Sequence, residues 1–284
     1  MPPTPPATSS VAPALRFDRL LLTGAAGALG RQLRTRLKPH CERLRLSDIA
    51  DLGPAQPGEE VVQAALQDGP AIEALLRDVS AVVHLGGISV EGPFEPILQA
   101  NIIGVHNLYE AARRNAVKRI VFASSNHVTG FYRQDQVIDA TRPVRPDGNY
   151  GVSKAFGENL SRFYFDRYGI ETVCLRIGSC FPEPKDRRML ATWLSYDDLE
   201  RLVVASLSAP VVGHSIVYGM SDNASTWWDN IPARHLGYVA QDSAETYRAE
   251  TIARQPVLDM NNPATLLQGG AYTTLGPYPC GDTP

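Results

Sequence analysis

The feature that most constrains the fold of this chain is an alternation of short apolar runs with longer helical patterns, from Leu15 to Gly178. Short apolar runs bounded by turns predict buried strands, and helical patterns between them predict a parallel sheet that is covered on both faces. The expected fold is therefore α/β with a doubly wound sheet. Strands are predicted at 19–23, 44–47, 60–63, 81–85, 119–123 and 172–177, with helices at 72–77, 96–115 and 150–168.

The regions on either side of this alternation have a different composition. Residues 1–14 contain five prolines and no charge, without the basic and apolar stretches of a signal peptide, so we expect a disordered Pro-rich tail. The alternation fills residues 15–180, which we expect to bind a dinucleotide and to hold the catalytic residues. Residues 181–284 begin with prolines and include a helix capped by Ser195, and we expect a small substrate-binding lobe there.

Three glycines spaced by three follow the first predicted strand. Glycine lets the backbone approach a pyrophosphate closely, and the next helix then points its N-terminus at the phosphate, as in Rossmann-type folds. The spacing differs from the usual G-x-G-x-x-G, so a tight Gly/Ala turn is the alternative interpretation. The candidate cofactor contacts in this loop are Gly24, Ala26, Gly27, Ala28, Leu29 and Gly30.

An acidic residue after the second predicted strand indicates which dinucleotide binds. Asp48 is placed to bond a ribose 2′-hydroxyl and to repel a 2′-phosphate, which favours NAD over NADP. Asp51 is a competing candidate, and a solvated turn aspartate is the alternative for Asp48. Leu85, Gly86 and Gly87 follow the fourth strand, where a loop would pass beneath the dinucleotide.

A tyrosine and a lysine lie on one face of the predicted helix at 150–168. Tyr150 and Lys154 are four residues apart, and a nearby cation would lower the pKa of the phenol toward a range useful for a base. Y-x-x-x-K alone arises often by chance, but this one lies at the carboxyl edge of the sheet, where ligands bind. The polar run 124–127 follows the fifth strand and could hold a substrate that bears hydroxyl groups.

Together these motifs resemble the extended short-chain dehydrogenase/reductase superfamily: T-G-x-x-G-x-x-G at 23–30, Asp48, Asn101, Ser125, and Tyr150 with Lys154. The resemblance implies that Ser125 polarises the reacting oxygen and that Tyr150 is the acid/base. Lys154 would lower the pKa of the tyrosine and hold the nicotinamide ribose. Asn101 would join a proton relay, or is otherwise a helix-face residue. Leu66 and Ile177 are further cofactor contacts that the resemblance implies.

Further motifs resemble the uronate dehydrogenases: the segments 84–89, 124–127, 176–180 and 227–230, with Pro182, Pro184 and 188–190. This resemblance implies NAD-dependent oxidation of glucuronate or galacturonate at C1, which gives the aldarolactone. It implies substrate contacts at Ser89, Ser125, Asn126, His127, Tyr150, Ser179 and Arg188. One motif departs from the family: Asp-Leu-x-Asp after the third strand is Ala65-Leu66-Gln67-Asp68 here, so we expect a changed adenine contact through the main chain of Leu66.

The chemistry of a uronate agrees with these residue types. Ring hydroxyls suit Ser, Asn and His, and one carboxylate suits an arginine that binds it through two hydrogen bonds. Composition alone does not choose Arg188 over Arg187 or Lys185, and His127 could be a structural hydrogen-bonding residue. Trp227 and Trp228 fit the core or an interface better than a sugar-stacking platform.

Composition excludes several other classes. The net charge of −3 gives no basic face for nucleic acid, and no apolar run is long enough for a membrane helix. The four cysteines lack metal-type spacing and indicate a reducing cytoplasm, so neither a metal nor a disulfide is expected. The remaining alternatives are a nucleotide-sugar epimerase or dehydratase and a non-catalytic NAD-binding regulator. Extended dehydrogenases often dimerise through their two long helices, so a homo-oligomer is expected.

Overall fold

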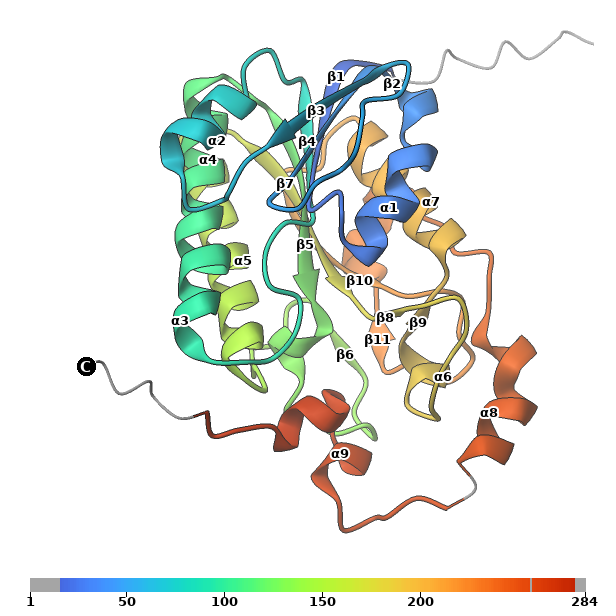
Figure 1. Ribbon diagram of the computed structural model, residues 1–284. Coiled ribbons are helices and arrows are strands. Elements are labelled where there is room, and N and C mark those ends of the chain that lie inside the picture. The colour runs from blue at the N-terminus through green and yellow to red at the C-terminus, as the bar shows by residue number, and fades with distance from the viewer. Residues whose placement is uncertain (1–15, 256, 279–284) are drawn as a thin grey trace, which may run out of the picture.

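A seven-stranded parallel sheet forms the centre of the protein in a computed structural model that describes residues 16–255 and 257–278 (Figure 1). The strand order is β10-β7-β5-β4-β1-β2-β3, so the direction of winding reverses between β1 and β4. This order confirms the predicted Rossmann-type fold. The strands are β1 Phe17–Thr23, β2 Cys41–Asp48, β3 Glu59–Gln63, β4 Ala81–His84, β5 Arg119–Ser125, β7 Glu171–Ile177 and β10 His214–Gly219.

Helices cover both faces of this sheet, as the near-continuous apolar character of its strands predicts. On one face, α1 (Ala28–Arg36) and α7 (Tyr196–Ser208) pack over a core that includes Leu20, Leu22 and Leu202. On the other face lie α2 (Gly69–Leu75), α4 (Gly104–Arg114) and α5 (Asn149–Tyr168) (Figure 1). Successive side chains of β1 therefore enter opposite cores, because strand side chains alternate between faces.

The long helix predicted at 96–115 is interrupted. It consists of α3 (Phe94–Ile97), a π-helical segment (Leu98–Ile103) and α4. Within the π-helical segment Asn101 is buried; its Oδ1 accepts from the Ile88 N–H at 2.7 Å and its Nδ2 donates to Ser153 Oγ at 3.0 Å. The widened turn therefore ties the loop after β4 to α5, which a regular helical pattern does not reveal.

The chain after Cys180 returns to the main sheet. Helix α7 begins at the predicted cap, where Ser195 Oγ accepts from the Asp198 N–H at 2.8 Å, and β10 then pairs with β7. The division at residue 180 stays a prediction, and the tail 1–14 lies outside the described residues. The remaining elements are η1 Lys38–His40, η3 Asn126–Thr129, β6 Ile138–Asp139, β8 Ser179–Cys180, α6 Met189–Thr192, β9 Trp193–Leu194, β11 Trp228–Asp229, η4 Ile231–Leu236, η5 Ala244–Tyr247, α8 Arg248–Arg254, α9 Pro263–Leu266 and η6 Gly270–Thr274.

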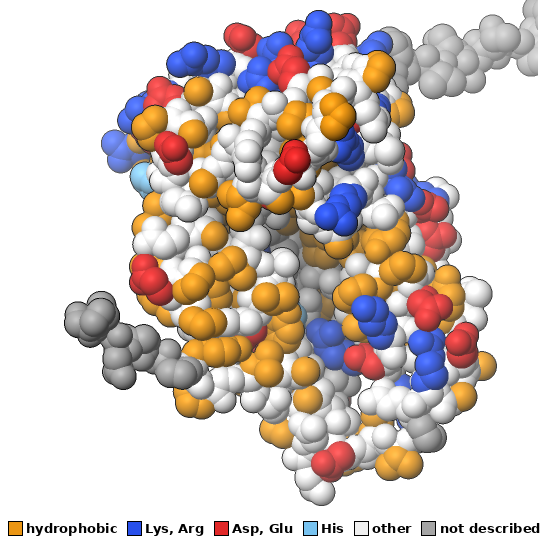
Figure 2. All heavy atoms as spheres, in the orientation of Figure 1, with side chains coloured by type: hydrophobic (Ala, Val, Ile, Leu, Met, Phe, Trp, Pro, Cys, Tyr) orange, Lys and Arg blue, Asp and Glu red, His pale blue; other side chains and the backbone are white. Residues whose placement is uncertain are grey.

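The carboxyl ends of β1, β4 and β5 open toward one side of the molecule. Figure 2 shows this surface hollowed between the part that carries α1 and the part that carries α6 and α9. Open parallel sheets bind ligands at such a reversal point. Within residues 16–255 and 257–278, no helix is long and apolar enough to cross a membrane.

Candidate active site

The glycine loop after β1 has the backbone geometry that a phosphate site requires. Gly24 has a φ of +68°, and a Cβ there would lie 2.6 Å from the carbonyl carbon of Leu85. A Cβ at Gly30 would lie 2.1 Å from the oxygen of Gly24. Gly27 is the N-cap of α1, and no side chain caps this helix. The first N–H groups of α1 are thus left to an anionic group, and the loop fits a dinucleotide.

Asp48 lies beside this loop at the end of β2. Its Oδ2 accepts from the Ala26 N–H at 2.9 Å, and its Oδ1 accepts from the Ala50 N–H at 3.1 Å. The competing candidate, Asp51, instead accepts from the Gly53 N–H in an exposed turn. The geometry therefore favours Asp48 as the carboxylate that faces a ribose.

The loop after β4 packs closely under the glycine loop. The Gly86 N–H donates to Thr23 Oγ1 at 3.2 Å, and Gly87 has a φ of +124° with no room for a side chain beside Asn101. Leu66 packs against Gly86, and its carbonyl accepts from Asn107 Nδ2 at 3.0 Å. The predicted contacts on three loops thus lie along one edge of the sheet.

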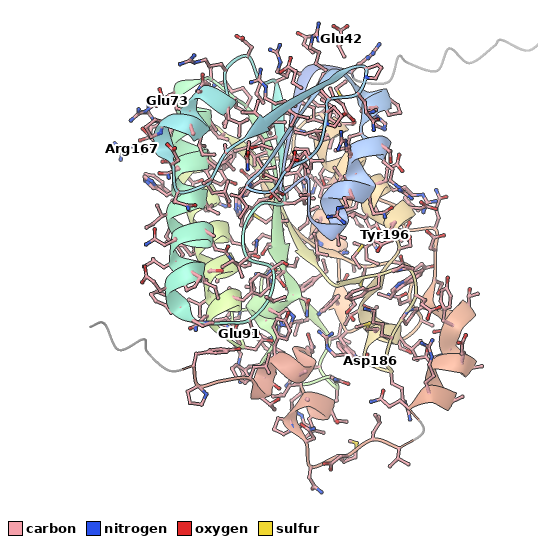
Figure 3. All side chains as sticks on the ribbon, viewed as in Figure 1. Glu42, Glu73, Glu91, Arg167, Asp186 and Tyr196 are labelled. Atoms are coloured by element: carbon pink, nitrogen blue, oxygen red, sulfur yellow. The ribbon has the colours of Figure 1, made fainter. Side chains whose placement is uncertain are left out.

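Tyr150, Lys154 and Ser125 meet at the start of α5. Lys154 Nζ lies 5.6 Å from the centre of the Tyr150 ring and donates to the Ala123 carbonyl at 2.8 Å. The Ser125 side chain interacts with Tyr150 closely enough to favour a lower pKa of the phenol. Glu91, on the loop after β4, accepts from the Tyr150 N–H at 2.8 Å and caps α5, with its side chain near the lower end of that helix (Figure 3).

The electrostatics of this group differ from the prediction. Burial raises the pKa of Tyr150 above its ordinary value, although the interaction with Ser125 acts in the opposite direction. Burial also lowers the pKa of Lys154 to about 8. The predicted lowering of the tyrosine pKa by Lys154 is therefore wrong for this structure. The lysine ammonium is directed at the Ala123 carbonyl, and desolvation of the phenol dominates.

Arg188 is a second focus of the site. Its Nε donates to the Gln268 carbonyl at 2.6 Å, and its Nη1 is 3.4 Å from Ser179 Oγ. With the Asn126 amide assigned the orientation that satisfies its neighbours, Nη2 donates to the Asn126 side-chain oxygen at 2.8 Å. Among the residues that the structure describes, no carboxylate lies within ion-pair distance of this guanidinium, and burial lowers its pKa. Lys185, by contrast, is exposed over the Phe181 ring. Arg188 is thus a half-buried cation without a carboxylate partner in the described part of the chain.

The other predicted site residues take different positions. Asn126 Nδ2 donates to the Ile177 carbonyl at 3.0 Å, which brings the ends of β5 and β7 together. Ser89 is exposed on the loop after β4, and the contacts within the described chain do not join it to Arg188 or His127. Trp228 is buried against Tyr218, as a core residue should be.

Two residues that the sequence did not indicate complete the site. The Tyr272 ring from η6 stacks on His127, with ring centroids 3.9 Å apart and an interplanar angle of 13°. The buried Asp147 accepts from His127 Nδ1 at 2.7 Å. Gly269 and Gly270 before Tyr272 are the only local hint, because tertiary packing, not a motif, places this segment.

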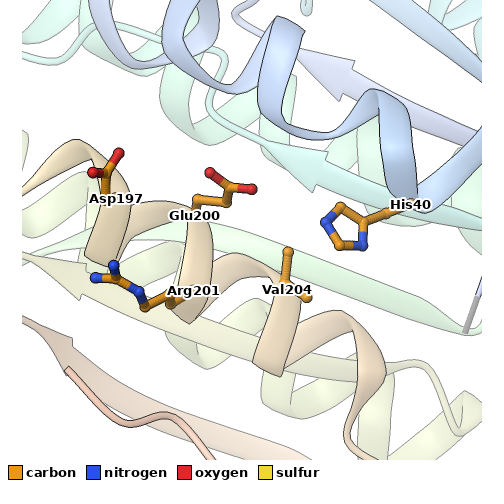
Figure 4. Close-up of a pocket in the computed structure, with 5 residues that line it drawn as sticks. All are labelled: His40, Asp197, Glu200, Arg201 and Val204. Atoms are coloured by element: carbon orange, nitrogen blue, oxygen red, sulfur yellow. The ribbon is translucent and has the colours of Figure 1, made fainter. Parts of the chain in front are cut away.

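A surface depression lies away from this site, and the described residues contain no set of metal ligands. Figure 4 shows a surface depression between η1 and α7, lined by His40, Asp197, Glu200, Arg201 and Val204. It contains none of the residues described above. Residues 16–255 and 257–278 hold no cluster of three or more His, Cys, Asp or Glu suited to a metal ion.

The fold, the site and the sequence relatives together identify an NAD-dependent oxidoreductase. The chain belongs to the NAD dependent epimerase/dehydratase family, whose model matches residues 20–204. It is 57% identical to a uronate dehydrogenase of Pseudomonas putida over 92% of this chain and 98% of that protein. A uronate dehydrogenase of Agrobacterium fabrum is 53% identical over 90% of this chain and 97% of that protein.

Solved structures give the same result. The crystal structure of a mutant uronate dehydrogenase from Agrobacterium tumefaciens, complexed with NAD, matches with a TM-score of 0.90 and 51% identity, covering 92% of this chain and 98% of that one. A glucuronic acid dehydrogenase from Chromohalobacter salexigens matches with the same TM-score of 0.90 at 50% identity, again over 92% of this chain and 98% of that one. The resemblance predicted from the motifs is confirmed.

Proposed function

We propose that this chain oxidises a hexuronate, glucuronate or galacturonate, at C1 to the aldarolactone with NAD. The observation that carries the proposal is Arg188, a half-buried cation without a carboxylate partner in the described chain, beside Asn126. Asn126 follows Ser125, whose side chain interacts with Tyr150. An anion-binding group and an acid/base group thus share one site, as a sugar acid requires. Uronate dehydrogenases at more than 50% identity support the same substrate class.

The coenzyme site fits NAD on three observations. The α1 N-terminus is uncapped, Gly24 and Gly30 admit no side chain, and Asp48 stands at the end of β2. When bound, NAD⁺ supplies the acceptor for the C1 hydride. The chain would hold its pyrophosphate at the glycine loop and its adenosine ribose at Asp48, with Lys154 available to the other ribose.

The chain's own residues would bind the substrate, orient its C1 hydroxyl and accept its proton. Arg188 binds the C6 carboxylate, and Ser125 orients the C1 hydroxyl. Tyr150, as phenolate, takes the proton of that hydroxyl while the C1 hydride leaves with two electrons. C1 is bonded to the ring oxygen, so its oxidation gives an ester within the ring, a lactone. Lys154, whose pKa is lowered to about 8, is largely cationic at neutral pH, and its ammonium would bind the nicotinamide ribose.

The deciding experiment is a spectrophotometric assay of NADH formation against glucuronate, galacturonate and the corresponding neutral aldoses, run with NAD⁺ and NADP⁺. We expect turnover of the uronates, a much lower rate for the aldoses and a preference for NAD⁺. Nucleotide sugars in the same panel, with product analysis, test the epimerase or dehydratase alternative. Absence of turnover with any sugar acid would contradict the proposal and favour the regulatory alternative.

We also propose a homo-oligomer in the cytoplasm. Val152, Phe163 and Tyr168 of α5 are exposed apolar or aromatic side chains on one of the two long helices. Cys41, Cys174 and Cys180 are all unpaired in the described part of the chain, which suits a reducing compartment. Light scattering on the wild type and on Phe163→Glu tests the assembly: an unchanged mass above that of one chain would exclude this face.

A further inference from the structure

Asp147 is a buried acid that the fold accommodates at a cost. It is 5% exposed, and its Oδ1 has no hydrogen-bond partner within residues 16–255 and 257–278. Burying an unsatisfied polar atom is unfavourable, so this side chain is hard to explain by stability alone.

The surrounding backbone is shaped to admit this carboxylate. A Cβ at Gly130 would lie 1.8 Å from Asp147 Oδ2, and a Cβ at Gly269 would lie 1.9 Å from the same atom. These glycines belong to separate segments that are joined by a hydrogen bond of 2.9 Å between the Gly269 N–H and the Gly130 carbonyl. Two segments therefore leave the space that the Asp147 side chain occupies.

The hydrogen bond of Asp147 determines the state of His127. A carboxylate only accepts hydrogen bonds, so the 2.7 Å contact between Asp147 Oδ2 and His127 Nδ1 places a hydrogen on Nδ1. Burial lowers the pKa of His127, so the ring is neutral near pH 7 and its Nε2 is an acceptor. Nε2 has no hydrogen-bond partner among the described residues.

The orientation of the ring is held as well as its tautomer. Tyr272 stacks on one face of His127, and Tyr150 meets the ring edge-on with centroids 5.9 Å apart. His127 also follows Asn126, which binds Arg188. The imidazole therefore contacts the acid/base group, and its chain neighbour Asn126 contacts the anion-binding group.

We propose that Asp147 is a positioning residue for the substrate: it holds His127 as the Nδ1–H tautomer, so that Nε2 accepts a hydrogen bond from a ring hydroxyl of the sugar acid. The proposal rests on the proposed function for the identity of the ligand. Asp147 itself does not touch the substrate. It acts through His127, as second-layer hydrogen bonds fix the tautomers of other functional histidines.

A double-mutant cycle tests this role. Asp147→Asn replaces a group that can only accept with one that can also donate, so the tautomer of His127 is no longer fixed. His127→Asn keeps a donor near the Nδ1 position and removes Nε2. We expect D147N to lower kcat/KM for the uronate about tenfold, mainly through KM, because one hydrogen bond to the substrate is lost. In the H127N background the same change should alter kcat/KM less than twofold. Equal effects in both backgrounds would overturn the proposal.

Asp198→Asn is the matched control. Asp198 is equally buried, but it lies on α7 and accepts from the N–H groups of Gln241 and Asp242. D198N should lower the melting temperature and leave KM for the uronate unchanged. An increase in KM like that of D147N would show that loss of any buried carboxylate disturbs the site.

Nitrogen-15 NMR of labelled histidines measures the tautomer directly. The resonances of His127 are assigned as those that are missing from the spectrum of H127N. We expect Nδ1 of His127 to carry the hydrogen in the wild type and the sugar acid to shift mainly the Nε2 resonance. Hydrogen on Nε2 in the wild type would overturn the proposal without any enzyme assay. If the wild type turns over no uronate, the proposed function is wrong. The NMR measurement still decides whether Asp147 fixes the tautomer of His127, because it does not depend on turnover.

Discussion

The two halves of the site are built in different ways. The coenzyme half uses backbone: the glycine loop, the loop at Gly86–Gly87 and the uncapped start of α1, all between β1 and β4. The substrate half uses side chains from four separated segments, namely 125–127, Asp147 with Tyr150, Ser179 with Arg188, and 268–272. Such backbone geometry would serve any dinucleotide, whereas the proposed set of substrate-binding side chains would select one class of substrate.

The largest effect is expected where the two halves meet. Tyr150→Phe removes the proposed proton acceptor, so kcat should fall by a factor of about 10² to 10⁴. Binding of NAD should change little, because the phenyl ring keeps its packing; calorimetry of NAD binding checks this. Tyr164→Phe, on the same helix but hydrogen-bonded to Glu110, is the control and should keep kcat. Near-wild-type turnover by Y150F would exclude the mechanism.

The next effect belongs to the substrate half alone. Arg188→Lys keeps the charge but loses the paired geometry, so KM for the uronate should rise roughly 10- to 100-fold, with KM for NAD unchanged. Steady-state kinetics with both substrates varied measures the two constants. Lys185→Gln, an exposed change on the same segment, should leave both unchanged. A parallel rise in both constants would mean that the two halves are not independent.

Sequence reasoning succeeded for the two halves to different degrees, for a physical reason. The doubly wound sheet was predicted from the local alternation of strand and helix patterns, and the loop from the local spacing of Gly24, Gly27 and Gly30. Arg188 was found only with the family motif, because its isolation from carboxylates is a property of packing. Asp147 and Tyr272 meet at His127 from segments far apart along the chain, and no periodicity encodes that contact.

The predicted direction of the pKa shift of Tyr150 was wrong for a related reason. A spacing of four residues places Lys154 near the phenol, but it does not show that the Ala123 carbonyl takes the ammonium. It also does not show that burial of the ring outweighs the interaction with Ser125. Desolvation depends on the whole surroundings of a group, and a motif reports only its neighbours along the chain.

A smaller effect is expected in the coenzyme half. Asp48→Ala should weaken NAD binding about tenfold and reduce the preference for NAD over NADP, because the acceptor for the ribose hydroxyl is lost along with its charge. The Ala26 N–H also loses its partner, so part of the effect comes from the glycine loop. Titrations with both coenzymes measure it. Asp51→Ala is the control, and a stronger effect there would reassign the ribose contact.

The smallest effect lies outside both halves and depends on pH. Glu59 has a buried carboxylate, and although burial raises its pKa, the contacts with Arg34 and Lys38 outweigh this and lower it to about 2. A pKa lowered by folding stabilises the protein above the ordinary glutamate value near 4.5, and this stability is lost as the pH falls toward 2.

Glu59→Gln should cost about 1 kcal/mol at pH 7, a fall of a few degrees in Tm, with kcat and both KM values unchanged. The difference in unfolding free energy between wild type and E59Q, from urea titrations at several pH values, should shrink between pH 5 and 3. A difference that stays constant over that range would mean that the glutamine replaces the hydrogen bonds and that charge contributes nothing at this position.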